Sequence, residues 1–346
     1  MECDTCQKNM KSLPTISIVI ATFNSSRTLG LCLRKIKEQD YPQDLIEIVT
    51  ADGGSIDNTR EIAKRYGARV IDVPKDKQNA EYNKGVGFQN AKNEIVLLLD
   101  HDNIMPHEGW IKKIIRPLME NPEVIGSEPL RFHYDKKMTV LDRYIALFGG
   151  SDPVVYYFGK NSHLSYATDK YNLFGKSQDK GYFYEITYSS DNIPALAGNG
   201  AAFRRKDLIN YATTKPQSFI HTDIAAQLIR GGHNKYALVK DSIIHLTNNK
   251  VFPFLSRRKY FVEKYQLDIQ YNRKYKIYDP KKDKAKLLMY ILFSVTIIIP
   301  LLDSVRGFLK IRDFSWFLHP FMCIAFLFIY SVPVFKGGVR NVLLEK

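Results

Sequence analysis

Apolar runs alternate with amphipathic stretches along the first hundred residues, and this alternation constrains the fold more than any other feature. Residues 16–21 form a β-branched run that predicts a buried strand, and Leu29, Leu33 and Ile36 then recur at helical spacing. Further strands are predicted at 46–51, 69–73 and 94–99, with helices ending near Ile62 and spanning 78–91. Such alternation predicts an α/β fold with a doubly wound, mostly parallel sheet.

Polar residues follow three of the predicted strands, at 22–26, 52–57 and 100–103. Ligands of open α/β sheets bind at the carboxyl ends of the strands, so these three segments are expected to form one cleft. Asp100 and Asp102 end a buried strand, where uncompensated carboxylates are costly. A bound Mn²⁺ or Mg²⁺ that also meets a phosphate would remove that cost. The alternative is a pair of aspartates that cap a helix or close a turn.

Residues 16–103 resemble the donor-binding half of the family 2 glycosyltransferases, which have an inverting GT-A fold. The resemblance rests on four stretches in order: Ser-Ile-Val-Ile-Ala-Thr-Phe-Asn at 17–24, Asp-Gly-Gly-Ser-Ile-Asp-Asn-Thr at 52–59, Asn-Lys-Gly at 83–85, and Asp-His-Asp at 100–102. The sequence departs from the family pattern at Gly53, where a second aspartate is common. The resemblance implies a domain that binds a nucleotide sugar, with UDP- or GDP-sugar as the donor.

The same resemblance implies roles for individual residues. The donor site would contain Thr22, Asn24, Asp52, Asn83 and Asp100. Asp52 would contact the base, Asp100 would approach the ribose or diphosphate, and Asp102 would be the leading ligand of Mn²⁺ or Mg²⁺. His245 ends a short strand-like run, and some relatives have a histidine near this place that meets the metal or the diphosphate. A structural role for His245 is the alternative.

A second set of motifs resembles the acceptor half of the family. Residues 197–205 (Ala-Gly-Asn-Gly-Ala-Ala-Phe-Arg-Arg) resemble its glycine-rich segment, and Thr222-Asp223 falls where the family has its catalytic acid pair. Asp223 is therefore predicted to be the catalytic base, since inverting transfer needs a carboxylate facing the attacking group. If the acceptor is an ionised phosphate, Asp223 would position it instead. Capping of the following helix is the alternative role.

Residues 131–190 are rich in tyrosine and weakly periodic, and they predict either an irregular surface excursion or an acceptor-binding segment. Residues 250–286 contain twelve Lys or Arg and four Asp or Glu, so more than half of the net charge of +14 lies there. This block favours anionic lipid headgroups, at about 1 kcal/mol per basic residue. Nucleic acid is the rival partner, but no nucleic-acid-binding motif accompanies the block.

Two uncharged apolar segments at 287–302 and 314–335 predict a C-terminal membrane hairpin connected by 303–313. A buried core helix is the alternative for the first segment. Upstream, Phe254, Leu255, Phe261, Val262 and Tyr265 share one face of a predicted interfacial amphipathic helix, with Arg257, Arg258 and Lys264 around it. The basic residues before the hairpin place the catalytic domain on the cytoplasmic side of the cell membrane.

The predicted organisation is a flexible N-terminus at 1–15, a GT-A domain at 16–250 with its donor half at 16–130 and acceptor half at 131–250, a basic interfacial segment at 251–286, and the hairpin at 287–346. Cys3 and Cys6 form a lone C-x-x-C, which lacks the second ligand pair of a zinc site. The predicted function is metal-dependent inverting transfer of a sugar from a nucleotide-diphosphate donor to a polyprenyl-phosphate or polyprenyl-diphosphate-oligosaccharide acceptor, in surface glycan or protein glycosylation.

Three alternative functions remain at this stage. A processive polysaccharide synthase would carry a Q-x-x-R-W motif, which is absent because neither Trp110 nor Trp316 lies in one. A nucleotidyltransferase would have a Gly- and Arg-rich loop after the first strand, where this chain has Thr-Phe-Asn-Ser-Ser. A non-catalytic, membrane-tethered sugar-nucleotide binder would need Asp100 and Asp102 but no residue in the role of Asp223.

Overall fold

The structure, a computed structural model, describes residues 13–168, 175–247, 250–263, 273–279 and 281–344. Cys3, Cys6 and most of the predicted flexible N-terminus lie outside these residues, as do Lys264 and Tyr265. The first half contains β1 (Ile16–Thr22), α1 (Ser26–Lys37), β2 (Ile46–Asp52), α2 (Thr59–Arg65), β3 (Arg69–Asp72), α3 (Ala80–Asn90), β4 (Ile95–Asp100), β5 (Asn103–Ile104), α4 (Trp110–Glu120) and β6 (Val124–Phe132). The second half contains α5 (Val140–Phe148), α6 (Pro153–Tyr157), β7 (Lys176–Asp179), β8 (Phe183–Thr187), β9 (Ala201–Arg204), α7 (Arg205–Tyr211), α8 (His221–Arg230), β10 (Lys235–His245), α9 (Val251–Phe261), α11 (Lys284–Thr296), α12 (Ile298–Lys310) and α13 (His319–Leu344).

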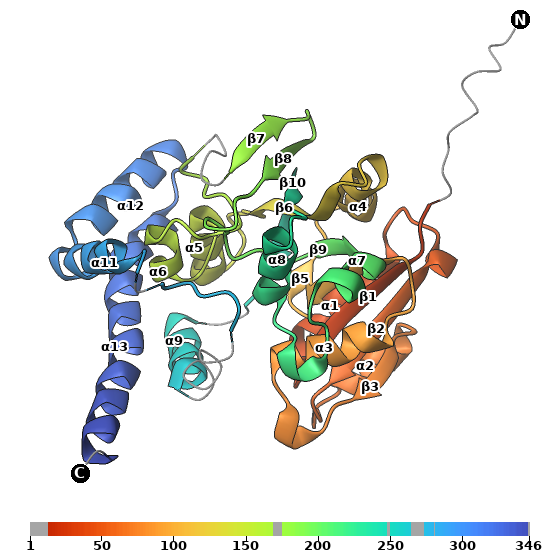
Figure 1. Ribbon diagram of the computed structural model, residues 1–346, viewed down its shortest axis with the longest axis horizontal. Coiled ribbons are helices and arrows are strands. Elements are labelled where there is room, and N and C mark those ends of the chain that lie inside the picture. The colour runs from red at the N-terminus through yellow and green to blue at the C-terminus, as the bar shows by residue number, and fades with distance from the viewer. Residues whose placement is uncertain (1–12, 169–174, 248–249, 264–272, 280, 345–346) are drawn as a thin grey trace, which may run out of the picture.

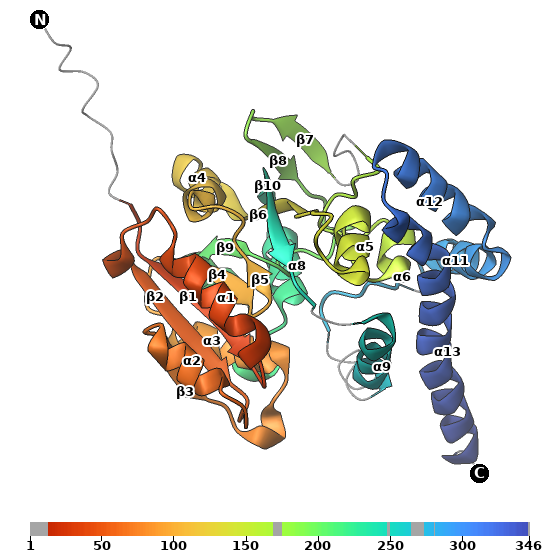
Figure 2. The same ribbon diagram turned by 180° about the vertical axis from the view of Figure 1, so that it is seen from behind.

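One mixed sheet runs through the molecule in the order β3-β2-β1-β4-β9-β6-β10-β8-β7, and β5 pairs with β10. β3, β2, β1 and β4 are parallel, as the sequence predicts. The rest of the sheet is mixed and corrects the prediction of a mostly parallel sheet: β9 runs antiparallel to both β4 and β6, whereas β6 and β10 are parallel. β9 follows the glycine-rich segment 197–200 and lies between β4 and β6, two strands that precede it in the sequence. The parallel strands lie at one end of the molecule and α11–α13 at the other (Figures 1 and 2).

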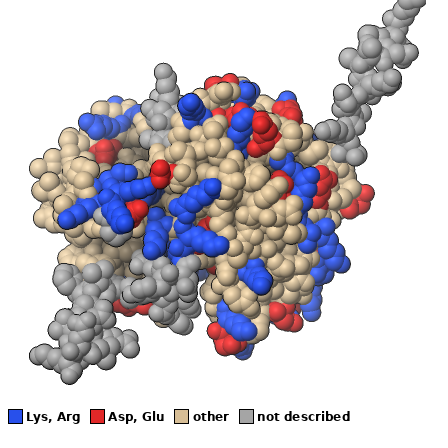
Figure 3. Space-filling view, in the orientation of Figure 1, with Lys and Arg blue, Asp and Glu red and all other residues tan. Residues whose placement is uncertain are grey.

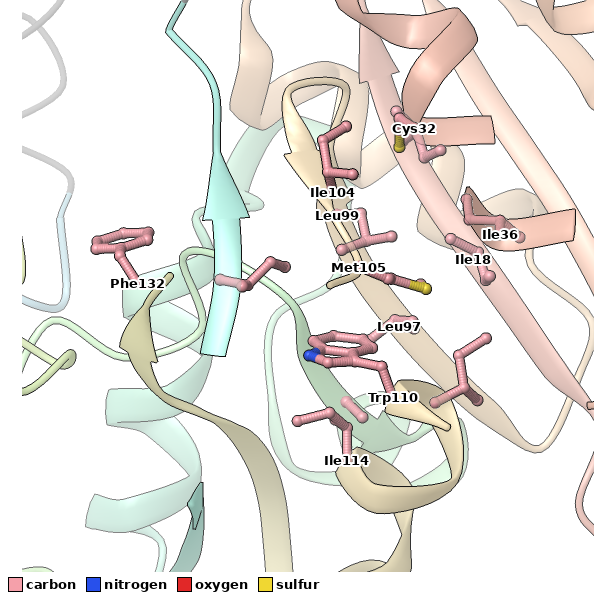
Figure 4. Close-up of a cluster of buried hydrophobic side chains, with 14 of the residues drawn as sticks. Ile18, Cys32, Ile36, Leu97, Leu99, Ile104, Met105, Trp110, Ile114 and Phe132 are labelled. Atoms are coloured by element: carbon pink, nitrogen blue, oxygen red, sulfur yellow. The ribbon is translucent and has the colours of Figure 1, made fainter. Parts of the chain in front are cut away.

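Side chains from the sheet and from α1 and α4 form the larger of two cores. Ile18, Leu97 and Leu99 alternate along β1 and β4 toward this core, as period-two strands require, and Trp110 packs beside them (Figure 4). The Trp110 indole is fully buried and donates from Nε1 to the Ser242 carbonyl at 2.8 Å. This bond ties α4 to β10 and so sets the position of the strand that ends at His245.

The segment 131–190 is more regular than its sequence indicates. α5 begins at the cap residue Thr139, whose side chain accepts from the Asp142 amide, and ends at Gly149 with φ +73°. Tyr144, Leu147 and Phe148 of this helix are buried. The tyrosines that blur the sequence pattern are largely packing residues, because Tyr156 and Tyr157 contact α5 or the C-terminal helices.

The C-terminal helices correct the predicted connection. Residues 303–310, predicted as part of a loop, belong to α12, which meets α11 at a bend of 80° around Ile297. The Asp303 carboxylate accepts from the Tyr157 hydroxyl at 2.9 Å, and Gly307 lies so close to Trp316 that an added Cβ would sit 2.4 Å from the indole. Contacts with Tyr157 of α6 and with Trp316 therefore hold this charged stretch against its neighbours.

Within the described residues, one helical stretch, 314–332, is long and apolar enough to cross a membrane, and α11 with α12 passes the same test only as a bent pair. The predicted amphipathic helix corresponds to α9. Phe254 and Leu255 pack against the core, but Arg258 differs from the prediction because it points inward. Its guanidinium bonds Asp152 Oδ2 at 2.9 Å and the Tyr330 hydroxyl at 2.7 Å.

Candidate active site

The parallel strands bring the predicted donor residues to one edge of the sheet. In the register of β1, Thr22 lies opposite Asp52 of β2, and Ala21 lies opposite Asp100 of β4. Parallel strands in register end together, so the polar residues that follow them must meet. The convergence predicted from the sequence is therefore present for Thr22, Asp52 and Asp100.

Asp52 holds the loop that follows β2. Its buried carboxylate accepts from the Thr22 hydroxyl at 3.0 Å, from the Ser55 amide at 2.9 Å and from the Ser55 hydroxyl at 2.6 Å. Arg60 Nη1 lies 3.3 Å away. Burial raises the pKa of the Asp52 carboxyl, but the hydrogen bonds from Ser55, Thr22 and Arg60 outweigh it and lower the pKa.

Asn24 and Asn83 lie at the same edge of the sheet. Asn24 has φ +49° and exchanges two bonds with the β2 loop, from its amide to Ser55 Oγ and from the Ile56 amide to its Oδ1. Asn83 donates to the Thr22 carbonyl at 3.3 Å, and its buried Oδ1 has no hydrogen-bond partner among the described residues. Gly53 has little room for a larger residue, because a Cβ there would lie 2.1 Å from the Gln78 side chain.

Asp100 and Asp102 differ in their partners. Asp100 Oδ1 pairs at 2.9 Å with Nζ of Lys84, a buried lysine that lies in the Asn-Lys-Gly stretch but has no predicted role. The His101 ring turns away toward Thr28, and its Nδ1 lies 2.8 Å from the Thr28 hydroxyl oxygen. Asp102 Oδ2 lies 3.6 Å from His245 Nε2, and its buried Oδ1 has no hydrogen-bond partner in the described part of the chain.

His245 reaches Asp102 because β5 pairs with the end of β10, in a register that sets His245 opposite Asn103. Its ring stacks on Phe132 at 5.4 Å, and the buried Nδ1 lacks a partner within the described ranges. Burial raises the pKa of the Asp102 carboxyl, but the His245 imidazole outweighs it and the pKa falls to about 2. Burial lowers the pKa of the His245 imidazole, but the nearby carboxylates of Asp102 and Asp100 outweigh burial. The pKa of His245 is therefore raised. No group of three or more His, Cys, Asp or Glu able to hold a metal occurs in the described residues.

A cavity of about 390 Å³ opens beside these residues. Phe132 and His245 line it from the sheet, Asn199 from the glycine-rich segment, and Arg258 from α9. Other lining residues are Glu81, Ile145, Asp152, Val155, His163, His221, Thr222, Phe261, Arg273 and Ile277. Glu81, Arg258 and Arg273 were not predicted as site residues, because nothing in their local sequence brings them to the strand ends.

Asp223 lies near this cavity but does not line it. It is the third residue of α8 and is buried, and its two carboxylate oxygens accept from the amides of Lys274 at 2.8 Å and Tyr275 at 3.1 Å. Arg273 Nε lies 3.6 Å from Oδ1. The structure therefore gives Asp223 backbone partners from a segment fifty residues away, and His221 faces the cavity from the same helix turn.

The comparison with protein families identifies the family of this chain. The profile of glycosyl transferase family 2 matches residues 17–211, more than half of the chain, and includes every predicted donor residue. The chain belongs to this family. It is a glycosyltransferase, and its mixed sheet is typical of the GT-A fold.

The relatives agree with this assignment. Glycosyltransferase AglE of Haloferax volcanii is 26% identical over 137 residues, which cover 38% of this chain and 45% of the relative. A dolichyl N-acetyl-alpha-D-glucosaminyl phosphate 3-beta-D-2,3-diacetamido-2,3-dideoxy-beta-D-glucuronosyltransferase of Methanococcus voltae is 30% identical over 120 residues, which cover 32% of this chain and 37% of the relative. The chain thus matches less than half the length of these curated relatives.

A solved structure shows the same fold over nearly the whole chain. The mannosyltransferase PcManGT from Pyrobaculum calidifontis, in complex with GDP-Man and Mn²⁺, superposes with a TM-score of 0.52 and covers 94% of this chain and 88% of its own. Sequence identity is 14%, so this likeness concerns the fold alone.

Proposed function

We propose that this glycosyltransferase transfers a sugar, with inversion and with a divalent cation, from a UDP- or GDP-sugar to a lipid-linked, phosphate-bearing acceptor. The observation that carries the proposal is the unpartnered, buried Oδ1 of Asp102 beside His245, at the edge where β1, β2 and β4 end. An unsatisfied buried carboxylate oxygen is costly, and a ligand that meets it would remove the cost.

The residues at this edge fit Mn²⁺ or Mg²⁺. Asp102 and His245 would hold the ion, and Asp100 lies two residues before Asp102 in the sequence. Oxygens of the diphosphate and of water would complete the coordination. A bound ion would supply Lewis-acid stabilisation of the departing diphosphate. Lys84 adds a fixed positive charge at the same place through Asp100. Asp52, Asn24 and Asn83 would form the nucleotide end of the donor site, with Asp52 also holding the loop in shape.

The acceptor end of the cavity favours a phosphate attached to an apolar group. Arg258 and Arg273 both line the cavity, and each leaves a buried Nε without a hydrogen-bond acceptor in the described chain. Guanidinium groups bind phosphate strongly through paired N–H donors. Phe261, Val155 and Ile277 supply apolar lining in the same cavity. The relative from Methanococcus voltae, whose name specifies a dolichyl-linked phosphate, supports this acceptor class.

The C-terminal helices favour attachment to the cell membrane, with the catalytic domain on its cytoplasmic side. Leu288, Leu292 and Val295 of α11 and Ile298 and Leu309 of α12 are each about 60% exposed or more. Exposed apolar surface of this extent marks a membrane or protein contact. Lys and Arg side chains gather on the face that carries α6, α8 and α11 (Figure 3), as contact with anionic headgroups would require.

Each helix of the α11–α12 pair has thirteen residues, a length of about 20 Å, which is shorter than the hydrocarbon core of about 30 Å. The pair therefore fits one leaflet rather than the whole bilayer. The predicted hairpin is replaced in this proposal by a bent pair that enters the membrane and a longer helix, α13, beside it.

A nucleotide-sugar screen tests the proposed donor. Thermal unfolding of the detergent-solubilised chain is measured with UDP- and GDP-sugars, each with and without Mn²⁺. We expect one sugar to raise Tm only when Mn²⁺ is present, since a ligand that binds the native state stabilises it. Asp102→Asn should lose this shift, whereas Asp44→Asn, at an exposed position, should retain it. A shift that is the same without Mn²⁺ would contradict the proposed metal role.

Vesicle flotation tests the proposed membrane contact. The wild type should float with vesicles that contain phosphatidylglycerol, and the double variant Leu292→Lys and Val295→Lys should float less, because two lysines replace exposed apolar groups of α11. Substitution of Ile209 by lysine, an exposed apolar residue on α7 in the catalytic domain, is the matched control. Equal flotation of the α11 variant and the wild type would contradict the contact.

A further inference from the structure

A histidine and a glutamate from distant parts of the chain form a pair in the cavity wall. His221 begins α8, and Glu81 is the second residue of α3. Glu81 Oε1 lies 2.7 Å from His221 Nδ1, and Glu81 Oε2 accepts from the His221 backbone amide at 3.0 Å. Both carboxylate oxygens are therefore used to hold one residue in place.

The pair leaves the other ring nitrogen of His221 available. A carboxylate at Nδ1 keeps the proton on that nitrogen, so that Nε2 carries the lone pair. No hydrogen bond from Nε2 to a described residue is present, and a Cβ built on Gly198 would lie 3.7 Å from it. Nε2 thus faces the glycine-rich segment at a point where no side chain intervenes.

The glycine-rich segment connects this histidine to the metal edge. Asn199 Oδ1 accepts from Asn103 Nδ2 at 3.0 Å, and Asn103 Oδ1 accepts from the Asp100 amide at 3.1 Å. His221, Asn199 and His245 all line the same cavity. His221 therefore shares the cavity with His245, whose Nε2 lies 3.6 Å from Asp102 Oδ2.

Asp223 has the opposite arrangement. Both of its oxygens accept backbone amides, and it does not line the cavity. Both oxygens already accept hydrogen bonds and Arg273 Nε lies 3.6 Å from Oδ1, so the carboxylate is engaged by residues 273–275 and not presented to the cavity. Its contacts suit a residue that anchors the segment at 273–275 to α8.

We infer that His221, held by Glu81, is the catalytic base, and that Asp223 has a positioning role. This inference rests on the proposed function. When the acceptor group is a hydroxyl, its oxygen attacks the anomeric carbon and its proton passes to His221 Nε2, which becomes an imidazolium. The bond from the anomeric carbon to the diphosphate oxygen breaks, and its electron pair leaves on the nucleoside diphosphate. Glu81 stabilises the imidazolium and fixes the ring orientation.

Turnover of the donor identified by the screen, with Mn²⁺ and with water or the sugar hydroxyl of a lipid-linked glycan as acceptor, tests the inference. His221→Gln should lower kcat about 10²- to 10⁴-fold, the usual contribution of a general base, with donor-induced Tm shifts retained. His233→Ala, which removes a histidine stacked on Tyr211 beyond the far end of α8, is the matched control and should turn over normally.

Glu81→Gln provides a second readout that a purely structural role would not move. The charged groups around His221 are Glu81 and Lys84 of α3, Asp223 on its own helix, Arg273, and His245 across the cavity. Loss of the Glu81 charge removes the nearest group that stabilises an imidazolium. The acidic limb of the kcat profile should therefore move to lower pH, while Glu81→Asp should restore part of the wild-type position.

Two results would overturn the assignment of His221. One is wild-type turnover in His221→Gln, and the other is an acidic limb that is identical in Glu81→Gln and the wild type. Loss of turnover in Asp223→Asn with an unchanged Tm would instead identify Asp223 as the catalytic base. A wild type that binds no nucleotide sugar would instead remove the proposed function on which the inference stands.

Discussion

The proposed donor site at the strand ends and the proposed acceptor side of the cavity are built by different kinds of contact. At the strand ends, Asp52 closes β2 and Asp100 closes β4 on either side of β1, and the register alone brings them to one edge of the sheet. On the proposed acceptor side, Glu81 meets His221 across 140 residues, and Asp223 meets Lys274 across 51. The first arrangement follows from a local sequence pattern, whereas the second depends on how distant segments pack.

This difference explains why Asp102 has a carboxylate oxygen available to a ligand, whereas both oxygens of Asp223 are hydrogen-bonded. Asp102 ends with a buried oxygen that lacks a partner in the described residues, as a ligand site should. Asp223 ends with both oxygens bonded to backbone amides, as an anchor should. A carboxylate in a recognised motif is thus open to a ligand only if no other part of the chain has already taken its oxygens.

The largest expected effect is on the donor side. Asp102→Asn should lower turnover by about 10²- to 10⁴-fold and weaken Mn²⁺ binding, because one anionic ligand is lost. Turnover with the nucleotide sugar and Mn²⁺ titration followed by electron paramagnetic resonance measure the two effects. Asn at position 102 can still accept from neighbours, so the Tm without ligand should change little. A variant with wild-type Mn²⁺ affinity would place the metal elsewhere.

Asp223→Asn should show the reverse pattern, with a loss of stability and little loss of chemistry. The amide offers one acceptor oxygen where the carboxylate offers two, so a buried N–H of Lys274 or Tyr275 loses its partner. We expect about 3 kcal/mol of destabilisation and turnover within about tenfold of wild type, measured by chemical denaturation and by activity below the new Tm. Unchanged stability would show that these amide contacts contribute little.

The smallest expected effect is on the pH dependence of the free energy of unfolding. The carboxylates of Glu128 and Asp52 should contribute to it in opposite ways. Glu128 accepts from the Ala197 amide at 2.7 Å and from the Tyr236 hydroxyl at 3.0 Å, at the start of the glycine-rich segment. Burial outweighs these bonds and raises its pKa from 4.5 to about 7, whereas the pKa of Asp52 is lowered. Protonated Glu128 therefore stabilises the fold below the unfolded pKa, and this stability is lost as the pH rises through 7.

The stabilisation by Glu128 should fall by about 2 kcal/mol between pH 5 and pH 7. Asp52 stabilises above its unfolded pKa and loses its contribution only as the pH falls below that value, so it should not contribute in this range. Denaturation of wild type and Glu128→Gln across the range isolates the difference, because the amide mimics the protonated acid. Parallel pH profiles would exclude a raised pKa at Glu128.

Much of the donor half can be predicted from the sequence, because apolar runs specify strands and parallel strands place their following residues together. Thr22, Asp52 and Asp100 meet for that reason. The mixed half of the sheet could not be predicted in this way. β9 is only four residues long and is inserted between β4 and β6, which are distant from it in sequence.

The acceptor side and the C-terminus were harder for a different physical reason. His221 is two residues from the predicted base, but only the position of Glu81 shows which residue of α8 faces the cavity. At the C-terminus, the apolar run 287–302 predicted one helix of a hairpin, yet Ile297 adopts φ +64° and divides this run between α11 and α12. That conformation is rare for a β-branched residue and carries no sequence signal.

Arg258 couples the cavity to the C-terminal helix α13, because its side chain contacts both. Its guanidinium bonds Asp152 at the start of α6 and Tyr330 in α13, and it also lines the cavity. If the proposed phosphate-bearing acceptor binds Arg258, it will compete with these bonds and so alter the packing of α13 on the rest of the chain. Under the proposed function, a change in the position of α13 would in turn change the affinity of the cavity for the acceptor, because the coupling acts in both directions.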